Sequence, residues 1–273
     1  MNRFYIAAAG LLLLASCKKD DVDVPAPTGP DLVRQWTLSL SPRNENPAPA
    51  GRTETGQVVI QLFSDNTIKY NLTVTGLAAG DALTAAHIHT GDPVTNGPVI
   101  LNFAPAFTNN TASGTITGVR QSFRDSLVGG TAELYFNVHS TQVASGLLRA
   151  QVNRTNELSM DVALSGANEV PAVTTTATGT ALLRLMTDKT LYTKVTVTNL
   201  EAGDALTAAH IHEAAAGANG PIIVPIYSAA SEFGTTKMTT LTDDIYNKVK
   251  NNAVYFNAHS TLHASGLIRG QIR

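Results

Sequence analysis

The seven histidines are the residues of this chain whose type and spacing could do chemistry. Each half of the sequence holds a His-x-His pair followed by one or two more histidines. The first candidate set is His87, His89 and His139, and the second is His210, His212, His259 and His263. Alternate side chains of a strand share a face, so a third histidine on a neighbouring strand would complete a three-nitrogen site. Such a set suits zinc or copper. The alternative is that these histidines hydrogen-bond one another, carbonyl groups and hydroxyl groups, and so hold loops in place.

The histidines recur because the chain repeats itself. Residues 77–89 and 200–212 are identical at 12 of 13 positions with an offset of 123. Residues 135–152 and 255–272 are identical at 12 of 18 positions with an offset of 120. A period of this length is that of a whole domain rather than of a solenoid unit. We therefore expect two tandem domains, at residues 32–153 and 156–273.

Each copy has the sequence pattern of short β-strands. Apolar and polar residues alternate over segments of the first copy, and turn residues such as Ser64-Asp65-Asn66 separate them. This spacing predicts an all-β chain of two Greek-key β-sandwich domains, either immunoglobulin-like or superoxide-dismutase-like. One exception is residues 241–251, which predict a helix capped by Thr242, with residues 121–128 as its weaker counterpart.

Each copy also carries an arginine that needs a partner. Arg149 and Arg269 lie in apolar strand ends, whereas Glu45 and Glu169 lie in Asn-Glu-x-Pro segments. A carboxylate is the natural partner of a buried guanidinium, so we predict the structural ion pairs Glu45–Arg149 and Glu169–Arg269. We assign no catalytic residue. General acid–base catalysis by carboxylates needs a second carboxylate, and the only other one that recurs at matching positions of the two copies is explained by a turn.

The first residues have the pattern of an export signal. Arg3 precedes an apolar run of 11 residues, too short to span a bilayer, and small residues then lead to Cys17, the only cysteine. This segment resembles a bacterial lipobox, which implies a signal peptide at residues 1–16 and acylation of Cys17. Residues 17–31 combine charges with proline and glycine, as flexible linkers do. We expect a protein held to the membrane by an N-terminal lipid anchor, in the cell envelope at the outer membrane and exposed at the surface.

The composition of the chain excludes several classes of protein. The 273 residues are 43% hydrophobic, enough for real cores, and carry a formal net charge of −2. This balance excludes the strongly basic surface of a nucleic-acid-binding protein. A single cysteine excludes an intrachain disulfide framework and a cysteine zinc site. The chain also lacks a glycine-rich phosphate loop and the Gly-x-Ser-x-Gly and His-Glu-x-x-His motifs.

The repeated blocks resemble the CHRD domain, a module named from the extracellular protein chordin. The motifs that carry the resemblance are Asn168-Glu169-Val170-Pro171, Ala209-His210-Ile211-His212, Asn219-Gly220-Pro221, Tyr255-Phe256-Asn257-Ala258-His259-Ser260 and Gly266-Leu267-Ile268-Arg269-Gly270-Gln271. The first copy differs in having Asn46 and Ala150 in place of Val170 and Gly270. The resemblance implies an extracellular, sandwich-like binding or scaffolding module. The His-x-His pairs also resemble those of copper–zinc superoxide dismutase, whose disulfide cysteines and bridging histidine this chain lacks.

Two functions follow as hypotheses. The first is a lipid-anchored, non-catalytic binding or structural module with an extracellular protein or glycan as its partner. Its partner-facing loops would be residues 90–95 and 213–218, which differ between the copies while their flanks match. The second is a zinc or copper protein, with a redox enzyme as its extreme form, built on the two histidine sets.

Overall fold

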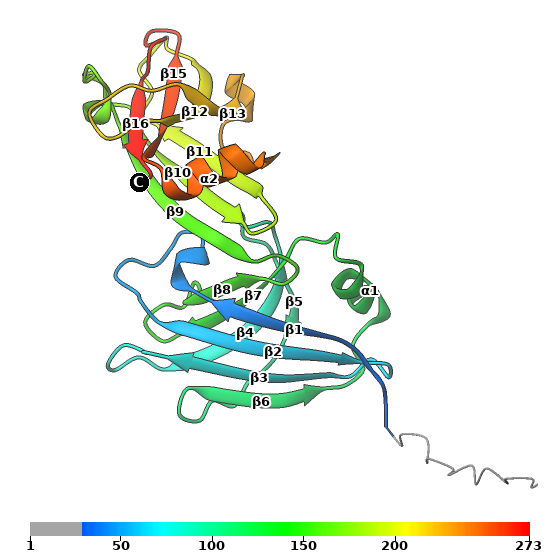
Figure 1. Cartoon of the computed structure of the whole chain (residues 1–273). Helices are drawn as coiled ribbons and strands as arrows, with labels where there is room; N and C mark the ends of the chain where they lie inside the picture. Colours follow the sequence, from blue (N-terminus) through cyan, green and yellow to red (C-terminus); the bar gives the residue numbers. More distant parts are fainter. Residues whose placement is uncertain (1–28) are drawn as a thin grey trace, which may run out of the picture. The chain divides into compact units, whose positions relative to one another are not determined.

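A computed structural model of the chain describes residues 29–273 (Figure 1). The predicted signal peptide, Cys17 and the linker up to residue 28 lie outside the described residues. Within the described part, no helix is long and apolar enough to cross a bilayer.

The first domain consists of two four-stranded antiparallel sheets. One has the strand order β1-β2-β3-β6 and the other β5-β4-β7-β8. In chain order the strands are β1 (Leu32–Leu40), β2 (Thr55–Phe63), β3 (Ile68–Thr75), β4 (Leu83–Thr90), β5 (Val99–Asn102), β6 (Thr111–Ile116), β7 (Leu134–Ser140) and β8 (Leu148–Gln151). A single bridge between Ser41 and Arg149 links the first sheet to β8.

The second domain repeats this arrangement. Its strands form one sheet in the order β13-β12-β15-β16-β9-β10-β11-β14, because a bridge between Ser165 and Arg269 joins the two halves. They are β9 (Asn156–Ser165), β10 (Thr178–Met186), β11 (Thr190–Thr198), β12 (Leu206–Glu213), β13 (Ile222–Tyr227), β14 (Lys237–Thr240), β15 (Val254–Ser260) and β16 (Ile268–Gln271). The prediction of two repeated all-β domains is confirmed, with sheets of a sandwich or barrel-like fold.

Each domain has its own apolar core. The alternation of the sequence decides which side chains enter it. In β4, Ala86 and Ile88 are fully buried and pack in the core with Phe136 of β7, so His87 and His89 must point to the opposite face. The core therefore fixes the direction of the histidines.

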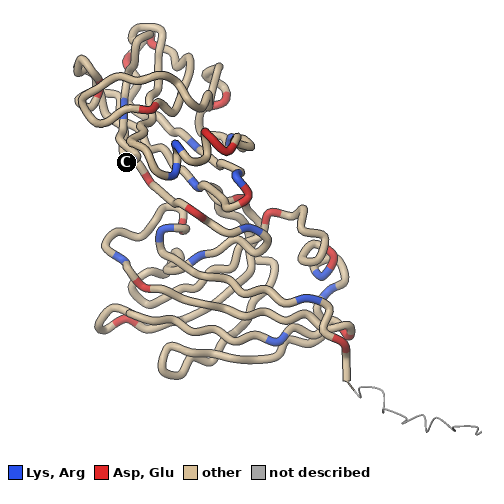
Figure 2. The backbone as a smooth tube through the Cα atoms, viewed as in Figure 1, with Lys and Arg blue, Asp and Glu red and all other residues tan. Residues whose placement is uncertain are grey.

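The described residues form two α-helices, α1 (Gln121–Gly129) and α2 (Asp243–Asn251), which bury Phe123 and Leu127 in the first core and Val249 in the second. The helix predicted at residues 241–251 is confirmed, and the Thr242 hydroxyl accepts a hydrogen bond from the Ile245 N–H group at 3.4 Å. Asp243 and Asp244 in the first turn and Lys248 and Lys250 in the last turn complement the helix dipole. Figure 2 shows positive and negative residues interspersed along the described chain.

Candidate metal centre

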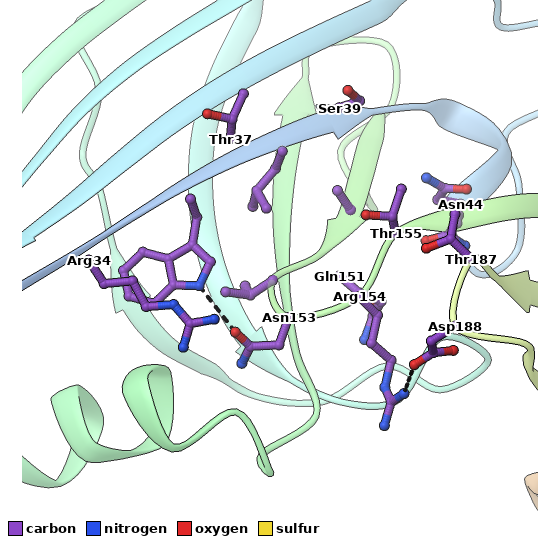
Figure 3. A pocket seen from close by; sticks show the side chains of 15 residues that line it. Arg34, Thr37, Ser39, Asn44, Gln151, Asn153, Arg154, Thr155, Thr187 and Asp188 are labelled. Atoms are coloured by element: carbon purple, nitrogen blue, oxygen red, sulfur yellow. Dashed lines mark hydrogen bonds and ion pairs between the residues drawn. The ribbon is translucent and has the colours of Figure 1, made fainter.

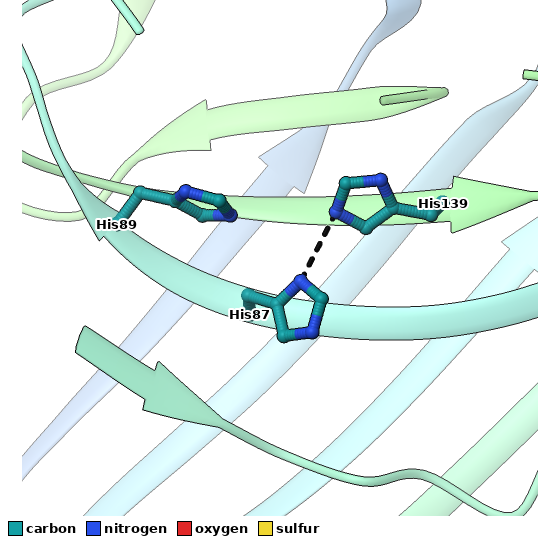
Figure 4. A group of neighbouring side chains, drawn as sticks. All are labelled: His87, His89 and His139. Atoms are coloured by element: carbon teal, nitrogen blue, oxygen red, sulfur yellow. Dashed lines mark hydrogen bonds between the residues drawn. The ribbon is translucent and has the colours of Figure 1, made fainter. Parts of the chain in front are cut away.

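The structure brings three histidines of each domain together. Strands β4 and β7 pair so that His87 lies opposite Asn137 and Ala85 lies opposite His139. His87, His89 and His139 therefore share one face, and their ring nitrogens lie within 4.8 Å of one another (Figure 4). In the second domain His210, His212 and His259 form the same group within the same limit. The pairing of β4 with β7, and of β12 with β15, thus brings three imidazole rings together in each domain.

Main-chain carbonyls fix the tautomers of two rings in each group. His89 Nδ1 lies 2.9 Å from the Gly97 carbonyl oxygen, and His139 Nδ1 lies 2.9 Å from that of Ala144. A carbonyl can only accept, so both Nδ1 atoms carry the proton and both Nε2 atoms keep a lone pair. His87 Nδ1 faces His139 Nε2 at 3.1 Å. Binding a cation there requires the His87 proton to move to its Nε2, with no change in charge.

The second group has the same hydrogen bonds at nearly the same lengths. His212 Nδ1 donates to the Gly220 carbonyl at 2.9 Å, and His259 Nδ1 donates to the Ala264 carbonyl at 3.0 Å. His210 Nδ1 and His259 Nε2 are 3.1 Å apart. Metal-binding histidines almost always donate their second N–H group to a carbonyl or carboxylate in this way.

One nitrogen in each group is buried without a partner. His89 Nε2 and His212 Nε2 are both shielded from solvent and make no hydrogen bond. Such orphaned polar atoms are rare in folded proteins and need an explanation. A cation bound by the three histidines would supply the missing partner in both domains.

The pKa values of these histidines favour the neutral, ligating form. Burial, with repulsion from neighbouring histidines, lowers the pKa of His87 and that of His210 to about 4. Burial also lowers the pKa of His89, His212 and His259. Neutral imidazole is the form that binds metal ions. These rings are therefore ready to bind a cation without first losing a proton.

A tyrosine and an arginine back the second histidine of each pair. The His89 ring stacks on Tyr135, with centroids 4.8 Å apart and planes 8° from parallel, and the Arg149 guanidinium lies 3.5 Å from the Tyr135 centroid. His212 and Tyr255 stack at 4.8 Å and 10°, with Arg269 at 3.4 Å. Strand alternation over residues 135–140 puts Tyr135 and His139 on one face, but it gives no sign of this stack.

The glycine that supports the stacked histidine has no room for a side chain. The Gly97 N–H group donates to the Tyr135 hydroxyl at 3.3 Å, while its carbonyl accepts from His89. A Cβ atom on Gly97 would lie 1.9 Å from the Thr90 carbonyl oxygen. Gly220 is equally confined by the Glu213 carbonyl oxygen. The glycine of the Asn-Gly-Pro segment in each copy is therefore required by the close approach of this backbone.

Comparison with protein families identifies these repeats. The CHRD domain model matches twice, over residues 36–152 and 160–272, and so covers most of the sequence. The chain belongs to the CHRD domain family. A search of curated proteins and a search of solved structures returned no match. Both histidine groups lie inside the CHRD matches, one in each domain.

The remaining candidate residues of the CHRD domains lie outside the histidine groups. His263 is not part of the second group, and its main-chain N–H group donates to the Ser260 hydroxyl at 3.2 Å. Val143 stands at the matching position of the first domain. The structure therefore builds two equal three-histidine groups rather than a larger one in the second domain.

The buried carboxylates and arginines hold the loops beside the histidines. Glu45 Oε1 accepts a hydrogen bond from the Asn137 amide at 2.7 Å, and Glu169 accepts the same bond from Asn257 at 2.7 Å. Arg149 instead donates to the Asp92 and Thr95 carbonyls at 2.7 and 3.0 Å. Burial raises the pKa of Glu45 to about 8, against the opposing charge of Arg149. Direct Glu45–Arg149 and Glu169–Arg269 ion pairs stay a prediction.

A cavity of about 460 Å³ near the segment between the CHRD domains is a weaker candidate site (Figure 3). Several of its polar side chains make hydrogen bonds or ion pairs. The Trp36 indole donates to the Asn153 amide oxygen at 3.1 Å, and Arg154 pairs with Asp188 at 2.6 Å and with Glu133 at 3.3 Å. These contacts join strands and domains, so they account for Trp36, Arg154 and Asp188 in the lining without a ligand.

Proposed function

We propose that this protein is a non-catalytic binding protein of the cell envelope, and that each of its CHRD domains binds one transition-metal ion. The ligands are His87, His89 and His139 in the first domain, with the corresponding histidines in the second. Three imidazoles with one open position suit zinc or copper. One observation carries the proposal: the ring nitrogens converge while the opposite N–H groups are tied to main-chain carbonyls, in both copies.

The envelope location rests on the sequence. Cys17 follows an apolar segment and small residues, as in lipoprotein signals. Acyl chains on this cysteine would anchor the chain by its end, and the linker would carry the CHRD domains away from the membrane surface. The anchor and the metal sites are separate proposals, because neither depends on residues of the other.

Metal content tests the proposed sites. The full chain is purified in detergent, stripped with a chelator, offered zinc or copper, and its bound metal is measured by mass spectrometry. We expect two ions per chain. Replacing His87 and His89 with alanine should leave one ion, and the matched change at His210 and His212 should do the same. Absence of retained metal, with a melting temperature that a chelator leaves unchanged, would refute metal binding and leave the histidines as structural residues.

The control variant for this experiment is His263→Ala. His263 lies close in sequence to His259 but outside the three-histidine group, so its loss should leave two ions bound. Loss of the second ion in this variant would contradict the proposed ligand set. Far-ultraviolet circular dichroism of every variant checks that the β-sheets are intact.

A further inference from the structure

An arginine side chain of the second domain is bound by the loop of the first domain that contains Glu45. The guanidinium of Arg184, from β10, is fully buried and donates to the Glu45 carbonyl oxygen at 2.7 Å. The same guanidinium pairs with Asp161 of β9 at 2.7 Å. Its positive charge also lies near the Glu45 carboxylate and opposes part of the rise in pKa that burial causes there. The loop that contains Glu45 therefore binds an arginine side chain that projects from a β-strand.

Two more polar contacts and an apolar contact accompany Arg184. The Ala48 N–H group donates to Asp161 at 2.9 Å, and the Ser159 hydroxyl donates to the Asn44 amide oxygen at 2.7 Å. Beside them Val94 is fully buried in a cluster with three apolar side chains of the second domain, Leu182, Met186 and Tyr192. The receiving surface therefore combines the Asn44–Ala48 segment with the 91–97 loop.

The repeat builds the same surface on the second domain, where nothing in the described chain covers it. Residues 215–219, which match the 92–96 loop, are exposed. Three polar groups of this surface make no hydrogen bond within the described chain: the Glu169 carbonyl oxygen, the Asn168 amide oxygen and the Ala172 N–H group. The matching groups of Glu45, Asn44 and Ala48 in the first domain all bond to the second domain.

A pocket lies at this place on the second domain. It has a volume of about 270 Å³, and its lining includes Asn168, Glu169, Val170, Ala216, Gly217 and Arg269. Four of these match Asn44, Glu45, Val94 and Arg149 of the first domain, where Asn44, Glu45 and Val94 contact the second domain and the charge of Arg149 lies near that of Arg184. Glu169 is 7% exposed, so a cation that reached it would be largely removed from water. Arginine tolerates this better than lysine, because a guanidinium is more weakly hydrated than an ammonium group.

We propose that the Glu169 pocket of the second domain binds an arginine side chain on a β-strand of a protein partner, in the way that the first domain binds Arg184. The partner strand would also offer an acceptor for the Ala172 N–H group, as Asp161 does for that of Ala48. This inference goes beyond metal binding and does not depend on it, since no histidine lines the pocket.

A probe with a guanidinium group tests the pocket directly. The full chain, with its alanine methyl groups labelled with carbon-13, is titrated in detergent micelles with N-acetyl-arginine N-methylamide. We expect saturable shifts of the Ala167 and Ala216 methyl signals, with a dissociation constant of ~1–10 mM. The lysine and norleucine analogues should bind at least about fivefold more weakly. Equal responses to all three probes, or no shift at either methyl group, would overturn the proposal.

The first domain supplies a matched control in the same spectra. The Ala48 methyl signal should not respond, because Arg184 already occupies the corresponding place. In the Arg184→Ala variant the arginine probe should shift the Ala48 signal, while the Ala167 response stays unchanged. Ala216→Trp should fill the second-domain pocket and abolish the shift of Ala167. An Ala167 shift that persists in this variant would place the probe elsewhere and contradict the proposal. Metal content is measured separately, so either proposal can fail alone.

Discussion

The guanidinium of Arg149 lies 3.5 Å from the ring centroid of Tyr135, and this pair links the loop of the first domain to its histidines. Arg149 donates to the Asp92 and Thr95 carbonyls of the loop, while the Tyr135 ring stacks on His89. One buried side chain thus fixes both the loop backbone and the surface against which a histidine rests. Arg269 and Tyr255 have the same relationship in the second domain.

Replacing Tyr135 with leucine should weaken metal binding by the first domain only. Leucine removes the flat surface on which His89 and Arg149 rest, and loss of such a supporting group typically costs ~10–100-fold in metal affinity. Tyr135→Phe retains the ring and loses only the 3.3 Å hydrogen bond from Gly97, so its effect should be smaller. Competition with a chromogenic chelator measures both affinities. Equal losses in the two variants would contradict a role for stacking.

Strand alternation explains why the histidine groups could be predicted from the sequence. In β4 the sequence Ala86-His87-Ile88-His89 alternates small or apolar residues with histidines, and the core takes Ala86 and Ile88. The position of the third histidine depended on which strand pairs with β4. The sequence pattern alone does not identify that strand; the pairing of β4 with β7, and the register that places His139 beside His87, come from the structure.

The supports of the site could not be predicted in the same way. The carbonyls that fix His89 and His139 belong to Gly97 and Ala144, whose side chains carry no chemical signal. Their positions depend on loop backbone geometry, which hydrophobic alternation does not encode. The partner of Arg184 was equally hidden, because a main-chain carbonyl of another domain accepts its hydrogen bond. Sequence patterns identify side chains that bind, but not the backbone that orients them.

The buried Glu45 should make the protein less stable as the pH rises from about 4.5 to about 8. Burial raises its pKa to about 8 from a usual value of 4.5, so the folded state holds a proton that the unfolded state has released. This contribution is complete below about pH 4.5 and is lost as the pH rises toward 8, at up to ~1.4 kcal/mol per pH unit. Glu169, whose pKa is raised to about 7, acts in the same direction at lower pH.

Urea unfolding at pH 7 and pH 8 measures this effect. We expect the free energy of unfolding to fall over that interval in the native chain and to fall less in Glu45→Gln, which keeps an acceptor for Asn137 but cannot titrate. The histidines, whose pKa values are lowered, act in the opposite direction and mainly below pH 6.5. A native chain whose stability is constant or rises between pH 7 and pH 8 would contradict the buried state of Glu45.

Gly97→Ala should displace the backbone that supports His89. The new methyl group would meet the Thr90 carbonyl oxygen at 1.9 Å, so the loop must move and the carbonyl that accepts from His89 must move with it. We expect the first domain to lose at least about tenfold in metal affinity while the second domain keeps its own. Gly220→Ala is the mirror variant and should spare the first site. Unchanged affinities in both variants would show that the carbonyl is dispensable.

Cys17→Ser should release the protein from the membrane, because acyl chains on this cysteine are the proposed anchor and serine cannot carry them through the same thiol chemistry. Phase partition in a cloud-point detergent measures the result. The native protein is expected in the detergent phase and the variant in the aqueous phase. Lys18→Gln, which keeps the cysteine, is the control and should remain in the detergent phase. A Cys17→Ser protein found with the detergent would refute the lipid anchor.

Val94→Asp should uncouple the unfolding of the two CHRD domains. Val94 is fully buried against Leu182, Met186 and Tyr192, and an unpaired carboxylate there would cost at least ~2 kcal/mol, so the domains should separate before either core opens. Trp36, the only tryptophan, is buried in the first core, so its fluorescence follows the unfolding of that core, whereas circular dichroism reports on both domains. The two signals should change together in the native chain and at different urea concentrations in the variant. Ala216→Asp introduces the same charge on the exposed loop of the second domain and should leave the transitions coincident. Coincident transitions in Val94→Asp would mean that Arg184 and its neighbouring hydrogen bonds hold the domains together without the apolar contact.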